Sequence, residues 1–115
     1  MPTEWEWEKG ARGTDGRPYP WGPEDPDETR ANYEMKVGQP TPVGSYPAGA
    51  SPYGLMDMAG NVWEWTASDY KKGPEKTVRG GSFNFHPDTL RAAIRSCYPP
   101  DSRGGPVGFR CAQDP

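Results

Sequence analysis

The chain has 115 residues, which suits one domain with a modest core and excludes a core plus an independent second module. Fifteen glycines and fifteen prolines predict a loop-rich structure, and five tryptophans, six tyrosines and three phenylalanines predict an aromatic core. The net charge of −3, without a long lysine or arginine cluster, argues against a nucleic-acid partner. No signal peptide and no apolar run of membrane-spanning length is present, which argues against a membrane and favours the cytoplasm.

The first predicted element is a short helix. Thr3 is a suitable N-cap, Glu4 and Glu6 place carboxylates in the first turn, and Gly10 or Gly13 ends it. From residue 14 to residue 49 the chain has no sustained period and is rich in proline, glycine and aspartate. This stretch predicts a long irregular segment, with residues 40–43 extended.

Strands are predicted in the second half. Alternation from Val62 places Trp63 and Trp65 on one face of a short strand and Glu64 on the other, and we expect both tryptophans to be largely buried. Residues 76–83 read as a strand that contains a glycine pair. Residues 88–96 are compatible with a helical turn or a strand, and residues 107–112 read as a closing strand.

Two cysteines and one histidine limit the metal and redox chemistry. Cys97 and Cys111 could form one disulfide, but two cysteines define neither a disulfide framework nor a zinc site, and His86 is the only histidine.

Several motifs together resemble one family. Residues 53–65 read YGLMDMAGNVWEW, residues 79–83 read RGGSF and residues 108–111 read GFRC, while residues 1–13 and the YPWG of residues 19–22 resemble the family's opening helix and turn. The family is the formylglycine-generating-enzyme-like, or sulfatase-modifying-factor, branch of the C-type lectin fold. The resemblance implies an α+β, loop-rich domain over residues 1–115 that lacks part of the N-terminal region of larger members.

The resemblance also implies a structural calcium site. Its ligands would be the carboxylates of Asp57 and Glu64 and the backbone carbonyls of Gly60 and Val62. Calcium takes about six to eight hard oxygen ligands, so this set with added water is chemically reasonable. The alternative is that Asp57 caps a turn and Glu64 is a solvated strand residue. The family's second calcium loop, near Asn32 and Tyr33, looks incomplete because the following segment is short and poor in acidic residues.

The catalytic residues of the family's enzymes look absent. Those enzymes hold copper with two cysteine thiolates, at positions that correspond to Phe85 and approximately Leu90, so we expect no copper and no catalytic activity. Related sulfoxide synthases need three iron-binding histidines in a separate domain. Cys111 resembles a family cysteine whose disulfide partner lies in a region that this chain lacks, and a buried free thiol is the reading we favour.

The segment between Ser82 and Gly108 resembles the variable region of proteins diversified by retroelements. A frame of RGGS, LRAA, further arginines and GFR brackets short runs that change in such proteins. By this resemblance the ligand-binding positions are Phe85, His86, Asp88, Ile94, Ser96, Cys97, Tyr98, Ser102, Gly104 and Gly105. Phe85, His86, Ile94, Cys97 and Tyr98 are expected to be more solvent-exposed than apolar residues usually are and to cluster, whereas Arg79, Gly80, Gly81, Arg91 and Arg95 are expected to be buried or hydrogen-bonded. Ordinary polar loops without a ligand are the alternative.

The sequence therefore predicts a non-catalytic module that binds a protein or surface ligand of unknown identity. Two other functions stay open. One is an enzyme of the formylglycine-generating family or an inactive remnant of one, for which a cysteine pair at Phe85 and Leu90 would be the discriminating feature. The other is a purely structural domain excised from a larger chain. The oligomeric state cannot be read from the sequence.

Overall fold

A computed structural model of the chain describes residues 1–113, so the last two residues of the predicted domain lie outside the described residues. The helix α1 spans Glu4–Arg12. Thr3 and Glu6 form a capping box, because the Glu6 N–H donates to the Thr3 hydroxyl and the Thr3 N–H donates to the Glu6 carboxylate. Gly13, with a φ of 67°, ends the helix as predicted.

The long irregular segment is also confirmed. Between α1 and the first strand the only regular element in the described chain is the 3-10 turn η1, Pro47–Gly49. Buried side chains hold this segment in two clusters. One contains Tyr19, Ala31, Tyr33, Ala59 and Leu90, and the other contains Trp7, Ala11, Met58 and Ala92. Aromatic rings thus supply much of the core, as the composition predicts.

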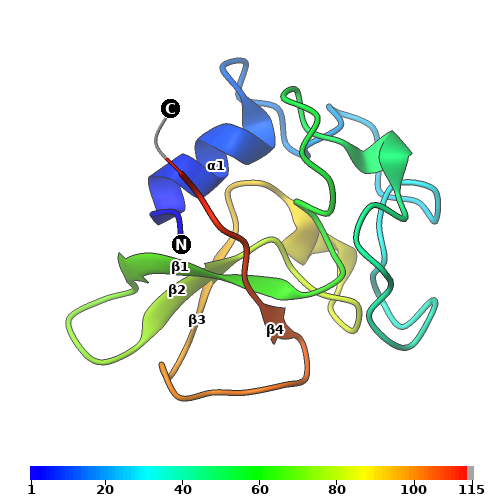
Figure 1. The fold of residues 1–115 in the computed structure, drawn as a ribbon. Helices are drawn as coiled ribbons and strands as arrows, with labels where there is room; N and C mark the ends of the chain where they lie inside the picture. The colour runs from blue at the N-terminus through cyan, green and yellow to red at the C-terminus, as the bar shows by residue number, and fades with distance from the viewer. Residues whose placement is uncertain (114–115) are drawn as a thin grey trace.

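Four short strands form one sheet in the order β3-β2-β1-β4. The strands are β1 (Trp63–Asp69), β2 (Lys76–Arg79), β3 (Arg95–Tyr98) and β4 (Val107–Gly108), and the 3-10 turn η2 (Pro87–Leu90) precedes β3. β1 and β3 pair antiparallel with β2, whereas β4 pairs parallel with β1. Figure 1 shows α1 on one side of the sheet and the β3–β4 connection on the other.

β2 and β4 are shorter than the predicted strands at residues 76–83 and 107–112. For β2 the reason lies in the backbone conformation of two glycines. β2 ends at Arg79 because Gly80 and Gly81 have φ values of 102° and 71° and turn the chain away. A side chain at Gly81 would place its Cβ 2.8 Å from the Thr89 hydroxyl oxygen. The closing strand is only two residues long. Residues 88–96 contain both predicted forms, the end of η2 and the start of β3.

The tryptophan prediction is confirmed for one of the two residues. Trp63 is 1% exposed, whereas Trp65 is only half-buried. Among the helices of residues 1–113, none combines the length and apolar composition needed to cross a bilayer.

Candidate functional site

The side of the sheet that faces α1 carries charged and hydrogen-bonded side chains, and we call it the helix face (Glu64, Thr77, Arg79 and Arg95). All of these except Arg95 are buried. Glu4 of α1 is 3% exposed and accepts from Arg95 Nε at 2.8 Å, Arg95 Nη2 at 2.9 Å and Arg79 Nη1 at 3.3 Å. Arg79 is fully buried and also donates to Glu8 and to the carbonyl of Ala92. Buried charges need such partners, so this network fixes α1 to β2 and β3.

The opposite side of the sheet is aromatic, and we call it the aromatic face (Trp63, Trp65, Val78, Ser96 and Tyr98). Alternation along each strand places these residues opposite the helix face. The rings of Trp65 and Tyr98 meet edge to face with centroids 6.3 Å apart. The register aligns Val78 with Trp65 and with Ser96, and Val78 is buried between them.

Two of the predicted ligand-binding positions, Ser96 and Tyr98, lie on this aromatic face. Cys97 lies between them in β3 and therefore points to the helix face, which corrects the prediction that it shares a surface with Tyr98. Its thiol donates to the Glu75 carboxylate at 3.3 Å. This hydrogen bond, burial and the negative charge of Glu75 raise the pKa of Cys97, so the thiolate is disfavoured.

Phe85 extends the aromatic surface from the loop before η2. Its ring meets Trp63 edge to face with centroids 5.3 Å apart. The N–H groups of Glu34 and Met35 donate to the carbonyls of Phe85 and Phe83 and hold this loop. Both donor residues adopt left-handed conformations, with φ values of 52° and 59°. Such conformations are strained for non-glycine residues, so this contact is a specific feature of the fold.

The other predicted positions surround the sheet. His86 and Asp88 are exposed at the start of η2, where His86 Nδ1 accepts from the Asp88 N–H. Ile94 is half-buried before β3, and Ser102, Gly104 and Gly105 lie in the connection between β3 and β4. Phe85, Ile94, Cys97 and Tyr98 are all half-buried and none belongs to the buried core, whereas His86 is exposed. Packing against Trp63 and Trp65 explains the partial burial of Phe85 and Tyr98.

A cavity of about 480 Å³ opens beside Trp65, at the margin of the aromatic face. Its lining residues are Met1, Trp65, Thr66, Ala67, Lys76 and Pro100. None of these six residues is among the predicted ligand-binding positions. The alternation of Trp63 and Trp65 was the signal that would have placed Trp65 there.

The predicted frame is confirmed except at one arginine. Arg79, Gly80 and Gly81 are buried, and Arg95 is hydrogen-bonded. Arg91 is exposed and makes no side-chain hydrogen bond within residues 1–113, which corrects its assignment to the frame. Cys111, expected to be buried, is an exposed free thiol because it follows β4 in the irregular C-terminal segment.

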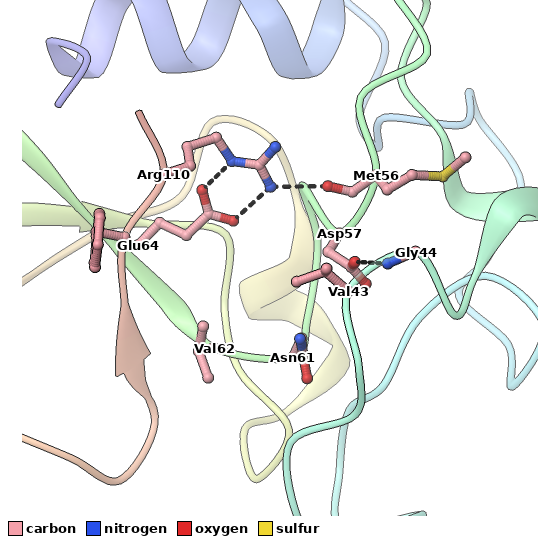
Figure 2. A pocket seen from close by; sticks show the side chains of 9 residues that line it. Val43, Gly44, Met56, Asp57, Asn61, Val62, Glu64 and Arg110 are labelled. Carbon is pink, nitrogen blue, oxygen red and sulfur yellow. Dashed lines mark hydrogen bonds and ion pairs between the residues drawn. The ribbon is translucent and has the colours of Figure 1, made fainter. Parts of the chain in front are cut away.

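Three of the four predicted calcium ligands, Asp57, Val62 and Glu64, line a second pocket of about 360 Å³, and Gly60 is not among its lining residues. Asp57, Val62, Glu64 and Arg110 are among its lining residues (Figure 2). Asp57 Oδ2 accepts from the Gly44 N–H at 2.8 Å. Gly60, with a φ of 80°, allows close packing, since a Cβ there would lie 2.4 Å from the Asn32 carbonyl oxygen.

The donor chemistry of this pocket fits calcium. Asp57 keeps Oδ1 free, and no hydrogen bond to the carbonyl oxygens of Gly60 or Val62 is found among residues 1–113. No three histidine, cysteine, aspartate or glutamate side chains gather into a metal-binding group in that part of the chain. A calcium ion here would therefore use backbone carbonyls together with Asp57 and Glu64, as predicted. Calcium binding stays a prediction.

Comparison with known proteins connects this geometry to a family. The model of the sulfatase-modifying factor enzyme 1-like domain matches residues 1–115. Hercynine oxygenase of Mycobacterium tuberculosis is 39% identical over 99% of this chain and 32% of its own length. The formylglycine-generating enzyme of Thermomonospora curvata is 37% identical over 100% of this chain and 49% of its own. The inactive C-alpha-formylglycine-generating enzyme 2 of Bos taurus is 37% identical over 97% of this chain and 43% of its own.

Comparison with solved structures also finds similar folds. PvdO from Pseudomonas aeruginosa superimposes with a TM-score of 0.80 at 29% identity, covering 95% of this chain and 50% of that one. Treponema denticola variable protein 1 superimposes with a TM-score of 0.73 at 28% identity, covering 95% and 45%. The chain spans about a third to a half of the length of these relatives. It belongs to the family of sulfatase-modifying factor enzyme 1-like domains and has the formylglycine-generating-enzyme-type fold.

Proposed function

We propose that this domain is a non-catalytic recognition module that binds a protein or surface ligand through the aromatic face and the loops around it. The observation that carries the proposal is the arrangement of β3. Ser96 and Tyr98 face outward beside Trp65 and the 480 Å³ cavity, while Arg95 in the same strand is fixed from behind by Glu4. Within β3, the side chains that face outward are thus on the opposite side from the arginine that binds α1.

The chemistry of the surface suits recognition. Tryptophan and tyrosine bury a large amphipathic area while few torsion angles are fixed, and for this reason they are enriched at interface centres. Trp65 and Tyr98 are half-buried in contact with each other, so their rings are already ordered before a partner arrives. Preorganisation of this kind lowers the entropic cost of association.

Similarity to other proteins supports a non-enzymatic module. The solved structures that resemble this domain include a variable protein of Treponema denticola, and the curated relatives include an inactive formylglycine-generating enzyme 2. We therefore assign the domain to the retroelement-diversified type of variable protein. Its changeable positions are those predicted between Ser82 and Gly108, apart from Cys97, whose side chain faces α1.

A second candidate function is formylglycine generation, which the 37% identity to the Thermomonospora curvata enzyme favours. The positions that resemble the copper ligands hold Phe85, whose ring meets Trp63 edge to face, and Leu90, fully buried in an apolar cluster. Neither side chain offers a thiolate. Incubation with copper(I), oxygen and a sulfatase-type cysteine peptide should leave the peptide thiol intact. Turnover that disappears in Cys97→Ser would establish the enzymatic reading instead.

Two displayed libraries test the recognition function. The first randomises Phe85, His86, Ser96, Tyr98 and Ser102. The second randomises Glu4 and its helix-face partners Thr77, Arg79 and Arg95. Both are sorted for protease resistance and then for binding to a panel of unrelated proteins. We expect the first library to yield many folded variants and specific binders, and the second to yield few folded variants. Loss of folding in the first library, or folded variants without any binder, contradicts the proposal.

A further inference from the structure

The Glu64 carboxylate at the predicted calcium site already has a cation of the chain beside it. Arg110 donates from Nε to Oε1 at 2.5 Å and from Nη2 to Oε2 at 2.9 Å, as Figure 2 shows. The indole of Trp7 adds a third donor to Oε1 at 3.0 Å. Since each carboxylate oxygen has about two acceptor positions, Oε1 is saturated and Oε2 retains one.

Arg110 is itself fixed in place. Its Nη2 also donates to the Met56 carbonyl at 2.8 Å, on the loop that leads into Asp57. An arginine guanidinium stays protonated in proteins. The pocket therefore contains a permanent positive charge next to one of its two carboxylates.

The charge count of the pocket follows directly. Asp57 and Glu64 supply two negative charges and Arg110 cancels one of them. Calcium affinity in oxygen sites depends strongly on the number of charged ligands and on the rigidity of the site. We propose that Arg110 is a built-in counter-ion that competes with calcium for Glu64, so that the site binds calcium weakly and the metal-free fold persists without it. This inference rests on the calcium site predicted at Asp57, Gly60, Val62 and Glu64.

The decisive variant is Arg110→Met, which removes the competing charge and leaves the buried Glu64 without an ionic partner. An uncompensated buried carboxylate destabilises the metal-free protein, and calcium then relieves that cost. We expect Arg110→Met to bind calcium about tenfold more tightly than wild type, or better. In chelator, we expect Arg110→Met to melt at a lower temperature than wild type. On addition of calcium, its melting temperature should rise by more than that of wild type.

Calorimetric titration with calcium measures the affinity, and thermal melts with chelator and with calcium measure the stability. Arg17→Met is the matched control, because it removes the same charge from an exposed pair with Asp15 and should behave as wild type. Asp57→Asn added to Arg110→Met should abolish the tight binding and so locate the ion.

Two results would contradict competition between Arg110 and calcium. If Arg110 instead orients Glu64 as a ligand, Arg110→Met will bind calcium more weakly than wild type or equally well, and the competition model is wrong. If neither protein binds calcium, the calcium site and the inference both fail. Should Arg110→Met not fold, Arg110→Gln keeps donors for Glu64 without the charge. Tighter binding in that variant supports competition, and unchanged or weaker binding overturns it.

Discussion

The two faces of the four-stranded sheet are stabilised by different interactions, ion pairs on one face and aromatic packing on the other. The helix face is closed by ion pairs, with Glu4 joined to Arg79 and Arg95 across segments far apart in the chain. The aromatic face is built from rings that touch at their edges and stay partly exposed at Trp65 and Tyr98. Because side chains alternate along a strand, one short strand contributes to both faces.

This difference indicates where the domain can change. Replacing one member of the buried ionic network leaves a charge without its partner, and such a substitution is expensive. Replacing a half-buried side chain at the aromatic face removes packing area without leaving an unpaired charge. We therefore expect the helix face to limit the fold and the aromatic face to tolerate variation.

The largest effect should come from Glu4→Ala. Two guanidiniums lose a buried partner, so we expect a cost of about 3–5 kcal/mol in the free energy of unfolding, toward the upper end of that range. Urea denaturation measures this cost, with the exposed Glu28→Ala as the control. If Glu4→Ala does not fold, Glu4→Gln provides a milder version. A cost below about 1 kcal/mol in either variant would show that the ionic network is not what holds the sheet.

Trp63→Ala tests the buried end of the aromatic face. Deleting a buried tryptophan costs about 3–5 kcal/mol, and here the lower part of that range is expected because the Phe85 ring can partly fill the space. Trp65→Ala should cost less because Trp65 is only half-buried. Chemical denaturation of both variants makes the comparison. Equal costs would mean that the aromatic face is core along its whole length.

A combined variant, Ser96→Asn with Tyr98→Ser and Ser102→Asn, tests tolerance at the outer end. We expect a total cost of about 1–2 kcal/mol in the free energy of unfolding, since no charge loses a partner.

Arg95→Ala alone should cost about 1.5–3 kcal/mol in the free energy of unfolding, because Glu4 loses two of its donors. Arg91→Ala should stay within about 0.5 kcal/mol of wild type, since its side chain is exposed. Unfolding of the combined variant while Arg95→Ala is neutral would reverse the assignment of the two faces.

Local signals explain which parts of the fold the sequence predicts. The Thr3 and Glu6 capping box, the proline-rich segment after α1 and the alternation around Trp63 act within a few residues, and each matches the structure. The family motifs predict the fold of the whole chain, and the family match covers residues 1–115. The length of β4 was overestimated, because pairing beside β1 involves only two residues.

The functional surface was harder to predict, because it depends on contacts between distant residues. Glu4 and Arg95 are 91 positions apart, and no local pattern announces their pairing. The resemblance groups Cys97 with Tyr98, although consecutive strand residues point to opposite faces of the sheet. Arg110 donates to the carbonyl of Met56, and its carboxylate partner Glu64, 46 positions away in the chain, becomes visible only in the structure.

The smallest effect concerns pH and again separates the two faces. Burial opposes ionisation of Glu8, but the hydrogen bonds and charges of Arg79 and Arg12 outweigh it and hold the pKa of Glu8 below its ordinary value. A carboxyl whose pKa is lowered by folding adds stability above its ordinary pKa, and this stability is lost as the pH falls through the lowered value. The contribution of Glu8 should therefore decline below about pH 4.5. The five residues of the aromatic face contain no carboxylate and add no such dependence.

Glu8→Gln tests this expectation, because glutamine keeps the shape of the side chain and cannot ionise. The free energy of unfolding of Glu8→Gln should be lower than that of wild type near neutral pH, and the difference should shrink as the medium becomes more acidic than the ordinary pKa of glutamate. Denaturant titrations at several pH values measure it, with Glu28→Gln as the exposed control. A difference that is constant across the acidic range would mean that Glu8 acts through packing, and that Glu4 is the carboxylate of α1 that stabilises Arg79.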